Sequence, residues 1–274
     1  MDRIKLVAID LDGTLLNGEH RISRANAGAI AACRAAGVGV MIASGRTWSS
    51  VGPYCKELGL TGPQITLNGG AIVEAPEGTI EAGTLMPEEI LRSITDHLQA
   101  LRLPFVIFGG KAIYALPGTA EAAELESFGE PAATIVTALD RDHLPDPIKI
   151  LVFSPDAEDD GKLIALAGGR TDTVRTHARF FEYVMPGVTK GTALAEVIAR
   201  KGLPRRSVMA VGDYYNDLGL FAAAGVSVAM GGAPEEVRAA ADFVTATCEE
   251  DGLARALEVH VLGKSSRRYE EAAR

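Results

Sequence analysis

The chain has 274 residues and a formal net charge of −9, from 27 Lys and Arg against 36 Asp and Glu. This length favours two domains, and a hydrophobic share of 47% excludes a wholly disordered chain. The acidic surplus argues against a nucleic-acid or membrane-surface partner, and three widely spaced cysteines exclude a disulfide scaffold.

Strand-like and helix-like runs alternate in the first part of the chain. The expected strands are 4–9, 38–43 and 64–67, and the expected helices between them are 24–36 and 48–58. Such alternation predicts a parallel sheet with helices on both faces. The apolar run at 4–9 is too short for a signal peptide or a membrane span, so we expect a cytoplasmic location.

From about Gly83 to Pro186 the pattern changes to a mixture of short strands and helices, which predicts an inserted α+β domain. The expected helices are 87–101, 119–127, 140–143 and 157–167. The expected strands are 105–108, 112–115, 134–137, 148–153, 173–176 and 180–184.

The first pattern then returns, with helices expected at 189–201, 217–224, 234–240 and 250–259 and strands at 207–211, 226–229 and 242–244. One α/β domain is therefore interrupted by another. We expect residues 1–83 and 186–274 to form a Rossmann-like, doubly wound core and residues 84–185 to form the inserted domain, with a frayed tail at 264–274.

Polar residues follow three of the predicted strands. Ligands of a parallel sheet bind beyond the carboxyl ends of its strands, so these residues should meet at one rim. Asp10 and Asp12 stand two apart after the first strand, and extended backbone points both side chains the same way. The other candidates follow the strands at 38–43 and 207–211: Ser44, Gly45, Asp213, Asn216 and Asp217.

The chemistry of this rim points to a metal ion and a phosphate. Crowded carboxylates raise one another's pKa values unless a cation is bound, and oxygen ligands without His or Cys select a hard ion such as Mg²⁺. Ser44 and Gly45 at a helix start form an anion-binding arrangement, and Lys190 can add positive charge. Each feature alone has an ordinary structural explanation as a turn, a helix cap or a surface lysine. The occurrence of all of them in this order, each at a strand end or a helix start, is far more specific for a catalytic site.

With these motifs, the sequence resembles the haloacid dehalogenase superfamily of Mg²⁺-dependent phosphohydrolases, and within it the Cof-type group. The resemblance runs from about Lys5 to Glu258. It rests on the motifs DLDGT (10–14), ASGR (43–46), NG (68–69), PGVTKG (186–191), GDYYND (212–217) and VAMG (228–231). The order of elements in the inserted domain, and its position, match the type IIB cap of that superfamily.

The resemblance implies roles for the motif residues. Asp10 would be the nucleophile that forms an aspartyl-phosphate, and also a Mg²⁺ ligand. Asp12 would protonate the leaving alcohol and then activate water, with its backbone carbonyl on the metal, and Asp213 would be the second carboxylate ligand. The phosphoryl oxygens would be held by Ser44, Lys190, Asn216 and the amides of Leu11 and Gly45. The supporting residues would be Arg46, Asn68 and Asp217, the last orienting Lys190 or a water on the metal.

These roles predict a phosphatase for small phosphate monoesters, such as sugar phosphates or related metabolites, acting as a monomer or small homo-oligomer. A phosphomutase or phosphotransferase is the alternative within the superfamily, and a non-enzymatic metabolite sensor is the third hypothesis. The inserted cap should choose the leaving group and move about connectors at Gly83 and at Pro186 and Gly187.

Two glycines depart from the family pattern. Gly219 stands where an acidic residue is common, and Gly232 stands where Asn is common, which puts loop rigidity and charge near the site in doubt. Tyr214 and Tyr215 are bulky for their loop. Packing is favoured for this pair over contact with the leaving group.

Overall fold

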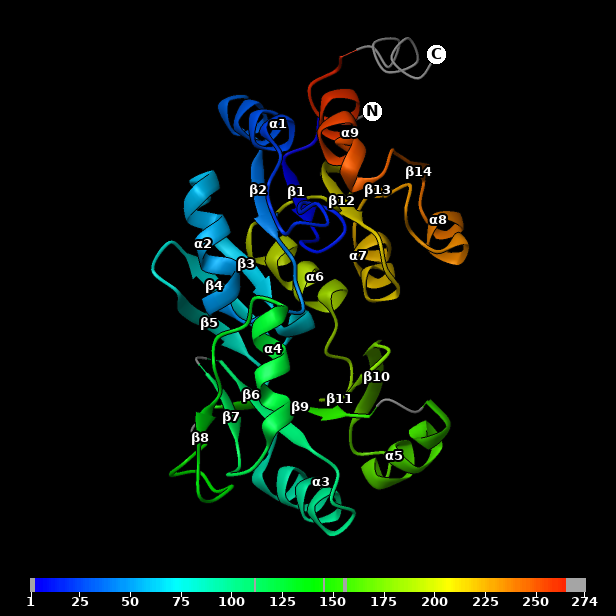
Figure 1. Cartoon of the computed structure of the whole chain (residues 1–274). Helices are drawn as coiled ribbons and strands as arrows, with labels where there is room; N and C mark the ends of the chain where they lie inside the picture. Colours follow the sequence, from blue (N-terminus) through cyan, green and yellow to red (C-terminus); the bar gives the residue numbers. More distant parts are fainter. Residues whose placement is uncertain (1–2, 111, 145, 155–156, 265–274) are drawn as a thin grey trace.

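The two ends of the chain together build one five-stranded parallel sheet (Figure 1). Its strands are β1 (Leu6–Ile9), β2 (Gly39–Ile42), β12 (Val208–Gly212), β13 (Val226–Ala229) and β14 (Phe243–Val244). They are paired in the order β14-β13-β12-β1-β2, so β1 is flanked by β12 and β2. The computed structural model describes residues 3–110, 112–144, 146–154 and 157–264; the tail expected to fray lies almost wholly outside them.

Helices cover both faces of this sheet, as the alternating pattern predicts. They are α1 (Arg24–Ala35), α2 (Trp48–Leu58), α6 (Lys190–Arg200), α7 (Leu218–Ala223), α8 (Glu235–Ala240) and α9 (Gly252–His260). Successive β1 residues point to opposite faces. Val7 and Ile9 pack with residues of α1, α2 and α9, whereas Leu6 and Ala8 pack with α6, α7 and α8. The predicted Rossmann-like, doubly wound core is therefore confirmed.

A second, antiparallel sheet extends this core beside β2. It consists of β3 (Gly62–Thr66), β4 (Ala71–Ala75) and β5 (Thr79–Gly83). The strand expected at 64–67 is β3. It is not part of the parallel sheet, but a parallel bridge between Ala43 and Ile65 joins it to the end of β2. β4 and β5 are not among the predicted elements, although two apolar runs around Pro76, Glu77 and Gly78 are typical of a hairpin.

The residues between the two core segments form a six-stranded sheet of order β10-β11-β9-β6-β7-β8. Its strands are β6 (Phe105–Gly109), β7 (Ile113–Ala115), β8 (Thr134–Ile135), β9 (Pro147–Phe153), β10 (Asp172–His177) and β11 (Phe180–Val184). All pairs are antiparallel except β7 with β8. Its helices are α3 (Glu88–Ala100), α4 (Glu124–Ser127) and α5 (Asp160–Ala167).

The two faces of this sheet have different neighbours. Ile150 on one face packs with Ile94 of α3 and Leu163 of α5, whereas Phe108 on the other packs in a cluster that includes Val73 of β4. We call residues 84–185 the cap and the remainder the core. The boundaries at 83/84 and 185/186 stay predictions.

One expected cap helix is wrong. Residues 140–143 form a turn, because the Asp140 carboxylate accepts hydrogen bonds from the backbone N–H groups of Asp142 and His143 at 3.2 and 3.1 Å. Asp side chains that bind the following backbone in this way compete with helix formation.

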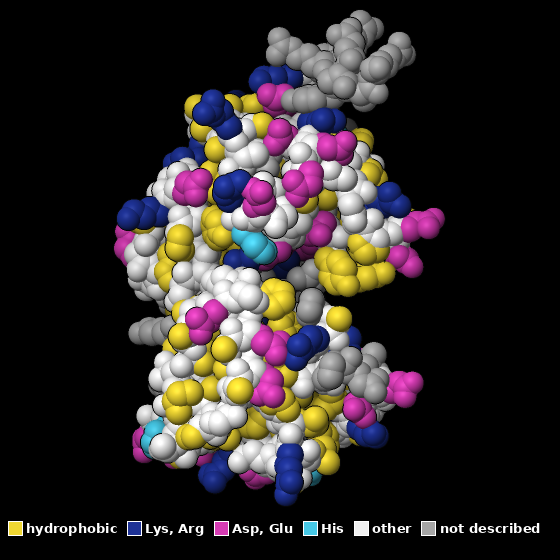
Figure 2. Space-filling model, viewed as in Figure 1, with side chains coloured by type: hydrophobic (Ala, Val, Ile, Leu, Met, Phe, Trp, Pro, Cys, Tyr) yellow, Lys and Arg dark blue, Asp and Glu magenta, His cyan; other side chains and the backbone are white. Residues whose placement is uncertain are grey.

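Figure 2 shows acidic and basic side chains interspersed over one face, with the surface indented between core and cap. Within the described part of the chain, no helix has the length and apolar character needed to cross a membrane.

Candidate active site

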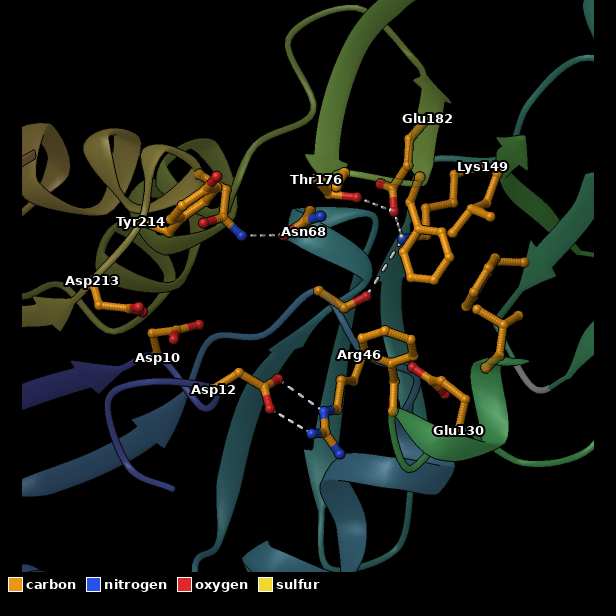
Figure 3. Close-up of a pocket in the computed structure, with 18 residues that line it drawn as sticks. Asp10, Asp12, Arg46, Asn68, Glu130, Lys149, Thr176, Glu182, Asp213 and Tyr214 are labelled. Carbon is orange, nitrogen blue, oxygen red and sulfur yellow. Dashed lines mark hydrogen bonds and ion pairs between the residues drawn. The ribbon is translucent and has the colours of Figure 1, made fainter. Parts of the chain in front are cut away.

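The predicted site residues converge at the carboxyl end of the parallel sheet. Asp10 follows β1, Ser44 follows β2 and Asp213 follows β12. Lys190 begins α6, and Asn68 lies in a short 3₁₀ turn (Leu67–Gly69) after β3. Figure 3 shows Asp10, Asp12 and Asp213 together at the core end of a cavity of about 570 Å³ between core and cap.

Lys190 lies between two carboxylates at the base of the site. Its Nζ is 2.6 Å from Asp10 Oδ1 and 2.7 Å from Asp217 Oδ1. The second oxygen of Asp217 accepts the backbone N–H groups of Asp213 and Tyr214 at 3.0 and 3.1 Å. Asp217 thus contacts both the lysine and the loop that carries Asp213, and its supporting role stays a prediction.

Three carboxylates crowd this base. Asp10, Asp213 and Asp217 each place one oxygen within 4.8 Å of the others. Burial and the charge of Asp217 raise the pKa of Asp10 well above its ordinary value and that of Asp213 to about 6, although Lys190 lowers both. For Lys190, burial alone lowers the pKa, but the charges of Asp10 and Asp217 outweigh it and the pKa is raised.

The donor set and the loop shape at this cluster fit a small hard cation. Its side-chain donors are carboxylate oxygens, which Mg²⁺ prefers. Gly13 has a φ of +77°, and a Cβ there would lie 2.4 Å from Asp213 Oδ2. The DLDGT loop can therefore approach Asp213 only with glycine at this position.

The Asp12 carboxylate lies apart from this cluster and is held by Arg46. Arg46 Nε donates to Asp12 Oδ2 at 2.8 Å, and a second guanidinium nitrogen donates to Oδ1, so the pair is bidentate. Arg46 is buried, whereas the Asp12 side chain is 47% exposed and lines the cavity. Burial lowers the pKa of Arg46, yet the hydrogen bond and the charge of Asp12 outweigh this and raise it.

Not all of the expected phosphate-binding residues line the cavity, because Ser44, Lys190 and Leu11 are buried and are not among its walls. Gly45 and Asn216 line the cavity, and Asn216 Nδ2 donates to Asn68 Oδ1 at 3.0 Å. Ser44 is buried close by, with its hydroxyl oxygen accepting the Arg46 backbone N–H at 3.2 Å. Leu11 is wholly buried.

The cap contributes an ion pair that the sequence did not reveal. Lys149 Nζ of β9 lies 2.7 Å from Glu182 Oε1 of β11, and both side chains are buried. Lys149 Nζ also lies 3.5 Å from the Gly45 carbonyl oxygen and 4.5 Å from the centre of the Phe108 ring. The available signal was a charged residue inside each of two otherwise apolar strands, PIKILVF and FFEYV, because such residues are rarely buried without a partner.

With this geometry in view, the comparison with known families is direct. A haloacid dehalogenase-like hydrolase profile matches residues 7–257. The chain belongs to the haloacid dehalogenase (HAD)-like hydrolases.

The chain is similar to several HAD proteins over nearly its whole length. It is 31% identical to the 5-amino-6-(5-phospho-D-ribitylamino)uracil phosphatase YcsE of Bacillus subtilis, covering 94% of this chain and 96% of that protein. A HAD-like hydrolase structure from Bacteroides thetaiotaomicron superposes with a TM-score of 0.83 at 30% identity, covering 93% and 99% of the two chains. A sugar phosphatase of HAD subclass IIB shares the fold, with a TM-score of 0.81 at 24% identity over 93% and 98%.

Of the two glycines that depart from the HAD pattern, Gly219 has a steric explanation and Gly232 has none. At the contact of α6 with α7, a Cβ on Gly219 would lie 3.3 Å from the Gly191 nitrogen, so Gly219 permits close helix packing. A Cβ on Gly232 meets no atom within 4 Å. Tyr214 is 43% exposed and lines the cavity, and its ring also packs edge-to-face on the Tyr215 ring, with 5.1 Å between their centroids. The Tyr215 hydroxyl lies 3.2 Å from Glu236, and the choice between packing and contact with the leaving group stays a prediction.

Proposed function

We propose that this HAD hydrolase is a Mg²⁺-dependent phosphatase for small phosphate monoesters, such as sugar phosphates, that acts through an aspartyl-phosphate. The observation that supports this proposal is the buried Lys190 between Asp10 and Asp217. Asp10 and Asp213 line the core end of a cavity whose opposite wall comes from the cap. The similarity to a phosphatase of a phosphorylated ribityl compound supports this substrate class. A cytoplasmic location and a monomeric or small oligomeric state stay predictions.

In the first proposed step, an Asp10 carboxylate oxygen attacks phosphorus. The new O–P bond forms as the ester P–O bond breaks, and Asp12 gives its proton to the leaving alcohol. In the second step, Asp12 takes a proton from water, whose oxygen attacks phosphorus and releases Asp10 and inorganic phosphate. Arg46 holds both oxygens of the Asp12 carboxylate at the cavity wall, so one of them must leave the guanidinium before Asp12 can carry the proton for the alcohol.

The negative charge of the phosphoryl group must be balanced before a carboxylate can approach it. Mg²⁺ held by Asp10, Asp213 and the Asp12 carbonyl would supply part of the positive charge. Lys190 supplies another part from within the protein, and its buried ion pairs fix its position. The remaining contacts to the phosphoryl oxygens are assigned to Ser44, Asn216 and the amides of Leu11 and Gly45.

Release of inorganic phosphate across a panel of sugar phosphates, with Mg²⁺ and with a chelator, tests this function. We expect turnover that disappears in the chelator and returns with added Mg²⁺. Phosphate that moves to an added sugar instead of water would indicate the phosphotransferase alternative. Failure to release or transfer phosphate from any substrate, including acetyl phosphate, would contradict an enzymatic role and favour a metabolite sensor.

A further inference from the structure

One oxygen of the buried Glu182 carboxylate lacks a hydrogen bond within the described residues. Oε1 lies 2.7 Å from Lys149 Nζ and accepts the Thr176 hydroxyl at 3.2 Å, whereas Oε2 has no partner. The Glu182 side chain is only 4% exposed. A buried carboxylate oxygen left without a donor is costly, so its retention calls for an explanation from outside the chain.

Glu182 lines the cavity on the side opposite the nucleophile candidate. Figure 3 shows Glu182, Thr176 and Lys149 reaching from the cap toward the cavity, across from Asp12 and Arg46. Because Lys149 Nζ is 3.5 Å from the Gly45 carbonyl, this group is adjacent to the proposed phosphoryl contacts. A substrate bound there would present to Glu182 the leaving-group atoms nearest to its phosphate.

The charges on the cap side do not favour an anionic leaving group. Among the described cap residues that line the cavity, Lys149 is the one cation, and Glu182 already neutralises it. Glu130 adds a further carboxylate. The other walls include the apolar side chains of Phe108 and Leu151. The cap side of the cavity therefore has no surplus positive charge. It offers apolar surface and one hydrogen-bond acceptor, Glu182 Oε2, that has no donor.

We propose that Glu182 determines substrate specificity, with Oε2 accepting a hydrogen bond from a hydroxyl of the leaving group. The preferred substrates are then phosphate monoesters of neutral polyhydroxylated compounds. A leaving group without a hydroxyl would give Glu182 Oε2 no hydrogen-bond donor, and a leaving group with a carboxylate would be repelled by the negative charge of Glu182. Lys149 positions the Glu182 carboxylate through the buried ion pair. This inference rests on the proposed phosphatase function.

The test compares kcat/KM for four substrates in the wild type and in Glu182→Gln. Glycerol phosphate and propyl phosphate differ in hydroxyl groups, phosphoglycolate carries a carboxylate, and acetyl phosphate is a minimal substrate. Loss of a charge-assisted hydrogen bond should lower the value for glycerol phosphate by roughly 10- to 100-fold. For propyl and acetyl phosphate, kcat/KM of the variant should stay within about threefold of the wild-type value. For phosphoglycolate, kcat/KM should rise relative to that for glycerol phosphate.

Glu182→Gln leaves the buried Lys149 without its carboxylate partner, and this could prevent folding. A second variant keeps the proposal testable in that case. The double variant Lys149→Met with Glu182→Leu removes both charges, and apolar replacement of a buried pair is often neutral for stability. It should prefer glycerol phosphate to propyl phosphate by no more than about threefold. The matched control is Glu124→Gln, a cap acid paired with Arg179 outside the cavity, which should behave as wild type.

The possible outcomes distinguish a failure of this inference from a failure of the proposed phosphatase function. If the wild type releases phosphate from none of the four substrates, the phosphatase assignment fails. If the wild type is active and the folded variants keep its preference for hydroxyl-bearing substrates, or lose activity equally on all four, the role of Glu182 is wrong and the phosphatase assignment stands.

Discussion

Glu130 of the cap and Thr47 of the core join the two parts of the chain at the start of helix α2. The Thr47 hydroxyl lies 2.6 Å from Glu130 Oε2, and the Thr47 backbone N–H donates to Oε1 at 3.0 Å. Ser50, in the first turn of α2, also donates to Oε2 at 2.7 Å. A cap carboxylate thus satisfies free donors at a helix N-terminus, where negative charge is favoured. The contact is one residue from Arg46, the partner of Asp12.

We therefore predict that Glu130→Gln weakens closure of the cap. Gln keeps the size of the side chain but loses the charge and one acceptor, and a hydrogen bond to a charged group contributes about 1.5–3 kcal/mol. KM for sugar phosphates should rise by about tenfold or more, while kcat/KM for acetyl phosphate changes little, because the minimal substrate needs few cap contacts. Steady-state kinetics on both substrates measure the difference.

The control for this prediction is Glu126→Gln, since Glu126 lies on α4 in the same part of the cap and is exposed. It should match the wild type on both substrates. An unchanged KM for sugar phosphates in Glu130→Gln would show that the contact does not help to hold the cap on the core.

The core could be predicted because its signals are local. The apolar run of β1 and the acids directly after it lie in one short stretch of sequence, so Asp10 could be placed at a sheet edge without knowledge of the fold. The same reasoning found Ser44 and Asp213 after their strands. Their convergence then followed from the rule that parallel strands end at one edge.

The cap side of the cavity could not be predicted because its contacts join distant residues. Lys149 and Glu182 are 33 positions apart, and Glu130 is 83 positions from Thr47. Side-chain pairing over such separations leaves no periodic pattern in the sequence. The Arg46–Asp12 pair is similar: the motifs contained both residues, but their mutual contact depends on how two loops meet in space.

The nucleophile assignment predicts that Asp10→Asn abolishes turnover. The replacement is isosteric and removes a crowded negative charge, so the fold and phosphate binding should persist. Loss of a covalent nucleophile should lower kcat by roughly a thousandfold or more, as measured by phosphate release at saturating substrate. Asp96→Asn changes an exposed acid on α3 and should retain full activity. Activity of Asp10→Asn within about tenfold of the wild type would rule out Asp10 as the nucleophile.

The close approach of α6 and α7 predicts a stability difference between two glycine variants. A Cβ on Gly191 would lie 2.3 Å from the Gly219 carbonyl oxygen, so Gly191→Ala should lower the free energy of unfolding by about 2 kcal/mol or more. Gly28 in α1 is exposed, and a methyl group added there would meet no atom within 4 Å, so Gly28→Ala should raise the free energy of unfolding by about 0.5–1 kcal/mol. Urea unfolding of both variants measures the contrast, and equal effects would contradict the tight helix contact.

The carboxylate cluster predicts that Mg²⁺ stabilises the protein more at high pH than at low pH. In a chelator, burial and the charge of Asp217 raise the pKa of Asp213 to about 6, and the pKa of Asp10 is also raised. The folded chain therefore binds protons more tightly than the unfolded chain, so this contribution to stability is present at low pH and is lost as the pH rises through about 6. Mg²⁺ relieves the resulting repulsion, so the rise in Tm on adding Mg²⁺ should be larger at about pH 8 than at about pH 5. Asp213→Asn should lose most of this difference in thermal unfolding, because it removes both a ligand and the titrating group. A Tm increase of equal size at both pH values in the wild type would mean that the cation does not bind to this cluster.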